Sequence, residues 1–360
     1  MNLKEYFNKE FISRLADEFF LVHKPFNKKA FVNEIISGDW TNLELKERMR
    51  LITNKMHDFL PFDYVKQIQL LKQVAPKFSG IQGFVFPDFV QVYGLADFKT
   101  SIKALEFLTE FSTSEFAVRP FIEKYPKESI KQLLEWSKSK NHHIRRLSSE
   151  GSRPKLPWAP PLREFIKNPK PVLPILENLK NDESLYVRKS VANHLNDISK
   201  NHPELVLEIA KKWYGKTKNT DWIVKQALRT LLKKGNKEAL AIFGTSNADK
   251  IKVDDLQLSR NKLKIGEDFT FTFGIQNTDT KHMTIRLEYI IHFMKSNGTT
   301  SPKIFKISET VLPAQTKKQL VRKHQFANLT TRKHYAGKHQ LAIVVNGDVK
   351  QRVVFELISF

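Results

Sequence analysis

The chain has 360 residues, of which 41% are hydrophobic, with 27 phenylalanines and 5 tryptophans. This length and apolar share exclude a disordered tail protein and indicate one long array of repeats or two domains. The net charge of +22 favours polyanionic partners such as nucleic acid, and the lack of cysteine excludes disulfides, thiolate nucleophiles and cysteine-bound zinc.

The N-terminal residues 1–20 have the pattern of a charged amphipathic helix, without the apolar stretch that a signal peptide requires. No apolar run in the sequence approaches the length of a membrane span. These features, together with the absence of cysteine, predict a cytoplasmic protein that does not interact with a membrane.

From the start to about Gly244, apolar residues recur every three or four positions, which predicts a helical region. Three segments in it begin with an aliphatic residue followed by a base, at Ile144, Val187 and Val224, with intervals of 43 and 37 residues. Such intervals are typical of two-helix HEAT or armadillo units, which bury their apolar faces by stacking on their neighbours. We therefore expect an α-solenoid with an inner surface for a long partner.

After about residue 250 the pattern changes to short alternating or β-branched segments separated by turn residues: 268–277, 283–295, 303–313, 317–326, 339–347 and 351–360. Strands at this spacing predict an all-β immunoglobulin-like sandwich. The expected fold is mainly α, a HEAT-like-repeat α-solenoid over 1–250 that binds DNA and carries catalysis, followed by the sandwich over 251–360.

The segment 144–162, "IRRLSSEGSRPKLPWAPPL", concentrates charged residues, prolines and a tryptophan at the end of an amphipathic helix. With "SEFAVRPFI" upstream and "VRKSVANHLNDISK" downstream, it resembles the HEAT-like-repeat DNA alkyl-base glycosylases of the AlkC type. The resemblance covers the helical region, and one branch of that family carries a similar β-sandwich. It implies removal of cationic alkylated bases, 3-methyladenine and 3-methylcytosine, from duplex DNA, without extruding the base into a pocket, in base excision repair.

The resemblance assigns catalytic roles to Glu115, Glu150, Trp158 and Asp197. A cationic base leaves as a neutral molecule, so the reaction chiefly needs carboxylates that stabilise the oxocarbenium-like sugar, and an aromatic face suits a cationic nucleotide. Simpler structural roles also fit these residues: a solvated residue at a helix end for Glu150, a cap on an apolar face for Trp158, and a solvent-facing position for Asp197. Glu115 also fits a capping box that begins at Ser112.

The basic residues Arg146, Arg153, Lys189, Lys225 and Arg229 are candidates for DNA contacts, because guanidinium and ammonium groups suit phosphates. His142 and His143 are adjacent and expected to point apart, so they make a poor metal site. No phosphate-loop spacing of glycines occurs. We therefore expect neither a metal nor a cofactor, and a monomer that acts on duplex DNA.

A second function also fits the composition, namely a HEAT scaffold that binds nucleic acid or protein without catalysis. Many solenoids only bind, and net charge cannot separate binding from catalysis. The combination of Glu150, Trp158 and Asp197 favours the enzyme, since a scaffold would need only the basic residues.

Overall fold

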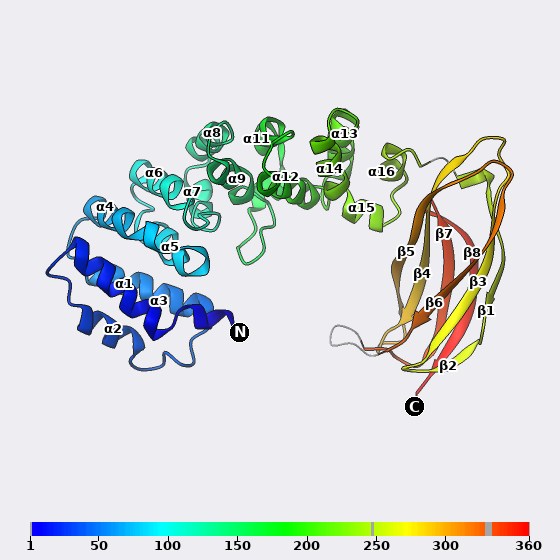
Figure 1. Cartoon of the computed structure of the whole chain (residues 1–360), viewed down its shortest axis with the longest axis horizontal. Coiled ribbons are helices and arrows are strands. Elements are labelled where there is room, and N and C mark those ends of the chain that lie inside the picture. Colours follow the sequence, from blue (N-terminus) through cyan, green and yellow to red (C-terminus); the bar gives the residue numbers. More distant parts are fainter. Residues whose placement is uncertain (1, 246–247, 328–332, 360) are drawn as a thin grey trace. The chain divides into compact units, whose positions relative to one another are not determined.

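Figure 1 shows a computed structural model of the chain, which describes residues 2–245, 248–327 and 333–359. The chain divides into two compact units, Met1–His202 with Gly215–Ala227 and Pro203–Tyr214 with Leu228–Phe360. The first unit is helical, and the second combines helices with two β-sheets. The predicted change from a helical to a strand-rich region is therefore confirmed.

Short helices that follow one another in chain order build the first unit (Figure 1). They are α1 (Lys9–Val22), α2 (Lys28–Ile36), α3 (Leu45–Asp58), α4 (Tyr64–Val74), α5 (Val85–Tyr93), α6 (Phe98–Leu108), α7 (Arg119–Lys124), α8 (Pro126–Trp136), α9 (His142–Gly151), α10 (Arg163–Lys167), α11 (Leu173–Leu179), α12 (Leu185–Ile198) and α14 (Lys218–Ala227).

Polar side chains fix where several of these helices begin. Asn8, Asp63 and Asp97 each accept a hydrogen bond from the backbone three residues ahead, which satisfies an otherwise unpaired N–H group. The three segments that share a register in the sequence form α9, α12 and α14, and α12 packs against both of the others. This packing brings residues some forty positions apart into contact.

The second unit contains α13 (Pro203–Trp213), α15 (Arg229–Lys233) and α16 (Lys237–Ile242) before its strands. The strands are β1 (Ile251–Leu258), β2 (Lys262–Lys264), β3 (Asp268–Asn277), β4 (Met283–Met294), β5 (Thr300–Leu312), β6 (Lys317–Gln325), β7 (Gly337–Val345) and β8 (Asp348–Ile358). Each of the six segments predicted from the sequence coincides with a strand, although residue 360, the end of the last segment, lies outside the described residues. β1 and β2 are additional.

Two sheets enclose the core of this unit, with strand orders β1-β3-β6 and β2-β8-β7-β4-β5. Neighbouring strands are antiparallel except β2 and β8. Alternate residues of β3, Phe269, Phe271 and Phe273, enter the core and meet Ile285 and Leu287 of β4 from the other sheet. The period of two in the β3 sequence thus corresponds to a face that is buried in the core, whereas β7 is buried on both faces over residues 341–345.

Contacts join the helices before residue 250 to the β7–β8 turn. The glycine backbones of Gly235 and Gly347 lie so close that a Cβ atom on Gly347 would be 2.4 Å from the Gly235 carbonyl oxygen. Lys237 forms an ion pair with Asp348 at 2.6 Å, also within this unit. Helices give way to strands at residue 250, but both compact units contain helices from before that residue. The domain limit at 250 therefore stays a prediction.

Within the described part of the chain, each helix is too short or too polar to cross a membrane.

Candidate active site

The turn at residues 111–118 carries Glu115 to the side of α9. Gly151, at the end of α9, permits this approach, because a Cβ atom there would lie 2.5 Å from the Val118 side chain. The capping box proposed for Ser112 and Glu115 is wrong, since the Ser112 hydroxyl donates to the Gly80 carbonyl. Glu115 instead accepts a 2.7 Å hydrogen bond from Thr113.

Three carboxylates and two arginines alternate in a continuous series, which we call the ladder: Glu115, Arg146, Glu150, Arg153 and Asp197. Arg146 lies 2.6 Å from Glu115 and 3.7 Å from Glu150. Arg153 lies 2.6 Å from Glu150 and 2.9 Å from Asp197. Helix spacing places Arg146 and Glu150 on one face of α9, and α12 brings Asp197 against it.

The carboxylates of the ladder are buried. Glu150 is 6% exposed and Asp197 is 3% exposed, so the interpretation of either as a solvated residue is wrong. Glu115, at 8%, is buried as well. Buried charges persist only when they are paired, and each of these carboxylates has a guanidinium partner.

The pairing also affects the arginines. Burial opposes the charge of Arg153, but the attraction of Glu150 and Asp197 outweighs it and raises the pKa of the guanidinium. The pKa of Arg146 is raised in the same way, against burial, by Glu115 and Glu150. Both arginines are therefore charged near neutral pH.

Small polar residues on α9 and α12 hold the two helices in register behind the ladder. The hydroxyl of Ser190 donates to that of Ser149 at 3.0 Å, and His194 Nδ1 lies 3.0 Å from the Ser149 carbonyl. A carbonyl can only accept, so Nδ1 carries the proton. Burial lowers the pKa of His194 to about 3, and the imidazole is neutral near pH 7.

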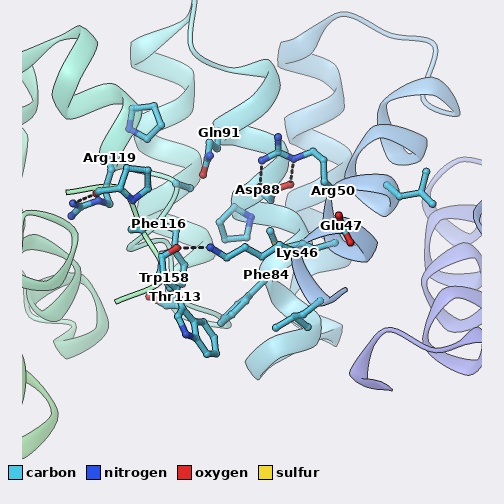
Figure 2. Close-up of a pocket in the computed structure, with 18 of the residues that line it drawn as sticks. Lys46, Glu47, Arg50, Phe84, Asp88, Gln91, Thr113, Phe116, Arg119 and Trp158 are labelled. Atoms are coloured by element: carbon cyan, nitrogen blue, oxygen red, sulfur yellow. Dashed lines mark hydrogen bonds and ion pairs between the residues drawn. The ribbon is translucent and has the colours of Figure 1, made fainter. Parts of the chain in front are cut away.

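The loop after α9 presents Trp158 with a φ of 67°, a left-handed conformation that a bulky residue seldom adopts. Lys46 donates to the Trp158 carbonyl, and buried Arg119 donates to the carbonyls of Gly151, Arg153 and Pro160 at 3.1, 2.8 and 2.6 Å. Figure 2 shows Lys46 and Arg119 reaching the loop from different helices. Burial lowers the pKa of Arg119 to about 10.

The Trp158 side chain is 57% exposed, so it does not cap an apolar face. It lines a cleft of about 690 Å³ between α3, α5, the turn at 111–118 and its own loop (Figure 2). Most of the lining is apolar, and Arg50 forms a two-point ion pair with the buried Asp88, at 2.9 and 2.8 Å. Thr113 lines the cleft and also binds Glu115, so cleft and ladder adjoin.

The predicted DNA contacts occupy different surroundings. Lys189 and Lys225 are exposed on α12 and α14. Arg229 is partly buried and belongs to the second compact unit. Arg146 and Arg153 point into the ladder, with side chains 14% and 8% exposed, and both face carboxylates.

The rings of His142 and His143 have centroids 4.3 Å apart, so the expectation that they point apart is wrong. Both rings also approach Tyr186, at 6.3 and 5.8 Å. Among the residues that the structure describes, no group of three or more histidines, cysteines and acids is arranged to hold a metal ion.

The residues that shape the site and that sequence reasoning missed include Thr113, Arg119 and Tyr186. Arg119 and Thr113 lie in or beside the "SEFAVRPFI" segment, but only their hydrogen bonds reveal their roles. Tyr186, 42% exposed, has its ring centroid 4.6 Å from the Arg146 guanidinium. The aliphatic-base pattern begins at the next residue, Val187, and does not include Tyr186.

Comparisons with known proteins identify the family. Residues 108–231 match the family described as DNA alkylation repair enzyme, and residues 252–359 match the C-terminal Ig-like domain of YhaZ. The chain is 49% identical to YhaZ of Bacillus subtilis over 99% of both chains.

Among solved structures, the chain is similar to the alkylpurine DNA glycosylase AlkC of Pseudomonas fluorescens, bound to DNA containing an abasic-site analogue. The TM-score is 0.91, with 37% identity, covering 99% of this chain and 100% of that one. Both relatives match across the helical and the strand-rich regions. The chain therefore belongs to the DNA alkylation repair family that includes AlkC and YhaZ, as its sequence resemblance predicted.

Proposed function

We propose that this protein is a DNA glycosylase that hydrolyses the N-glycosidic bond of cationic alkylated bases, 3-methyladenine and 3-methylcytosine, in duplex DNA. The observation that carries the proposal is the ladder, in which three buried carboxylates are gathered beside an exposed tryptophan. The match to AlkC over the whole chain supports the same reaction class. In this reading the protein acts as a monomer in the cytoplasm and starts base excision repair.

The chemistry follows from the charge of the substrate. A base that is already cationic departs as a neutral molecule, which removes the need for a strong general acid. The deoxyribose then carries the positive charge, and the fixed carboxylates Glu115, Glu150 and Asp197 stabilise it and orient the attacking water. Exposed Trp158 offers its ring face to the cationic nucleotide.

The architecture suits this task. We propose that the helices form a HEAT-like solenoid along which Lys189, Lys225 and Arg229 contact phosphates, and that the two-sheet region is an immunoglobulin-like domain that extends the grip on DNA. The match of residues 252–359 to an Ig-like family and the packing of α9, α12 and α14 support this assignment.

The alternative function is a scaffold that binds without catalysis. A scaffold has no use for buried carboxylates, which cost free energy to desolvate and must be paired to be tolerated. Trp158 adds a backbone conformation that is unfavourable by about 1–3 kcal/mol. Both features favour the enzyme.

The test is release of free base from methylated duplex DNA, without added metal or nucleotide, followed by mass spectrometry. We expect 3-methyladenine and 3-methylcytosine in the supernatant and abasic sites in the DNA. A protein that binds the duplex tightly and releases no base would instead be the scaffold.

A further inference from the structure

The side chain of Arg153 connects two carboxylates that come from different helices. Its Nη1 atom lies 2.6 Å from Glu150 on α9, and its Nε and Nη2 atoms each lie 2.9 Å from Asp197 on α12. Arg153 itself belongs to neither helix, because α9 ends at Gly151. The guanidinium is thus the link that fixes the distance between the two carboxylates.

The geometry leaves little of Arg153 for a DNA phosphate. All three guanidinium nitrogens already face carboxylate oxygens, and only 8% of the side chain is exposed. A phosphate that bound the Arg153 guanidinium would have to displace Glu150 or Asp197. The Arg119 bond to the Arg153 carbonyl, 2.8 Å long, further holds the residue in its inward position.

The charge pattern shows what the link does. Two carboxylates that approach each other in a buried site cannot both stay ionised unless a cation lies between them; otherwise they share a proton. Three carboxylates alternate with two guanidiniums in the ladder, and the partly exposed Lys200 also pairs with Asp197. Carboxylates that stay ionised in this way can stabilise a developing sugar cation.

We propose that Arg153 is a positioning residue, which keeps Glu150 and Asp197 ionised together at one fixed separation, and that it is not a phosphate contact. This inference rests on the proposed glycosylase function. Arg146 has the corresponding place between Glu115 and Glu150, with the Tyr186 ring over its guanidinium. Other charged or titratable groups near this pair include Lys200, Arg119, His194 and Tyr186.

The chain offers a matched control. Lys200 forms an ion pair with the same Asp197, at the same 2.9 Å, but its side chain is 41% exposed. Water can replace the Lys200 ammonium, whereas it has little access to the Arg153 guanidinium. Loss of Lys200 should therefore change the charge state of Asp197 far less than loss of Arg153 does.

The experiment measures single-turnover excision of 3-methyladenine as a function of pH for the parent, Arg153→Gln, Arg153→Lys and Lys200→Gln, together with affinity for an uncleavable duplex. Arg153→Gln should slow excision by about 10²-fold and move the acid limb of the profile upward by about one pH unit or more. Arg153→Lys should keep the acid limb near its original pH, but excise slowly, because one ammonium cannot bridge both carboxylates. Lys200→Gln should shift the limb much less.

An Arg153→Gln profile with an unchanged acid limb, coupled to weaker and less salt-sensitive DNA binding, would overturn the proposal in favour of a phosphate contact. If Arg153→Gln does not fold, Arg153→Lys decides: slow excision with unchanged affinity supports positioning, and near-normal excision refutes it. A parent protein that excises no base at any pH contradicts the proposed function itself, which keeps the two failures distinct.

Discussion

At the scale of residues, the site depends on charges that are buried together. The sequence and its family resemblance located Glu115, Glu150 and Asp197, but not how they are paired. The sequence predicts phosphate contacts for Arg146 and Arg153, because the local pattern shows only their spacing from Glu150. The pairing of Arg153 with Asp197 depends on the packing of α9 against α12, which joins residues 44 positions apart. The pairing of Arg146 with Glu115 depends on the turn at 111–118.

Neutral isosteres at the carboxylates test the electrostatic mechanism. Asp197→Asn and Glu150→Gln keep the shape of the side chain, and each should slow excision by about 10²-fold or more, or roughly 2.7 kcal/mol, because one stabiliser of the sugar cation is lost. DNA affinity should change much less. Single-turnover release of 3-methyladenine, measured beside binding to an uncleavable duplex, separates these effects.

The same mechanism fixes substrate choice. The parent should not release uracil or hypoxanthine, neutral bases whose departure needs protonation. Efficient release of uracil, or unchanged rates in both isosteric variants, would show that fixed negative charge is not the source of catalysis.

His194 gives the stability of the protein a pH dependence. Its pKa is about 3 in the folded chain, against about 6.5 in an unfolded one, so the unfolded state binds more protons between these values. The contribution of His194 is fully present above about pH 6.5 and is lost as the pH falls toward 3, at up to about 1.4 kcal/mol per unit.

Urea unfolding at pH 7.5 and pH 5 of the parent and His194→Asn measures this contribution. The variant should be less stable at pH 7.5, because the ring's packing is lost, but its stability should fall less on acidification. Titration of other groups cancels in the difference, and an equal fall in both proteins would mean that His194 is not buried in its neutral form.

At the scale of elements, most helices and strands were predicted from the spacing of apolar residues along the sequence. The six strands that alternate or run β-branched and aromatic, among them β3 and β4, were found, because each contributes side chains to the core or packs them against it. Two strands were missed. β2 has only three residues, too few to show a period, and β1 is interrupted by a bulge at Asp254 with a positive φ of 52° at Asp255.

The contact between Gly235 and Gly347 can be tested with alanine. Gly347→Ala places a methyl group 2.4 Å from a carbonyl oxygen, whereas Gly298→Ala adds one at a turn with open space around it. Both glycines have a positive φ, 85° and 76°, so the backbone penalty is similar in the two variants.

Gly347→Ala should therefore lower the free energy of unfolding by about 1 kcal/mol or more beyond Gly298→Ala, as overpacking of a fixed backbone does. Denaturant unfolding of the full chain measures both values. Equal decreases in the free energy of unfolding would indicate that the α15–α16 connection shifts to accommodate the added methyl group without further destabilisation.

At the scale of the whole molecule, the charge of +22 governs the encounter with DNA. Affinity for duplex DNA should fall steeply with salt, with a slope in log–log form of about −0.9 for each phosphate neutralised. Titrations of the parent between low and physiological salt measure the slope. Lys189→Gln and Lys225→Gln should each reduce it by about one unit, and a salt-insensitive affinity would remove phosphate contacts from the proposal.

Because Trp158 is exposed, its fluorescence should report on the candidate active site. Of the five tryptophans, Trp40, Trp136 and Trp213 are buried, Trp222 is partly buried, and Trp158 is 57% exposed. A collisional quencher such as iodide should therefore extinguish mainly the fluorescence of Trp158, and Trp158→Phe should remove most of the quenchable emission. Lys46 and Arg119 hold the backbone of the loop that carries this ring. Binding of the damaged DNA should shield Trp158 from the quencher. The rate of substrate binding can then be measured from tryptophan fluorescence, without an added label, in the same mixing experiment that follows release of the base.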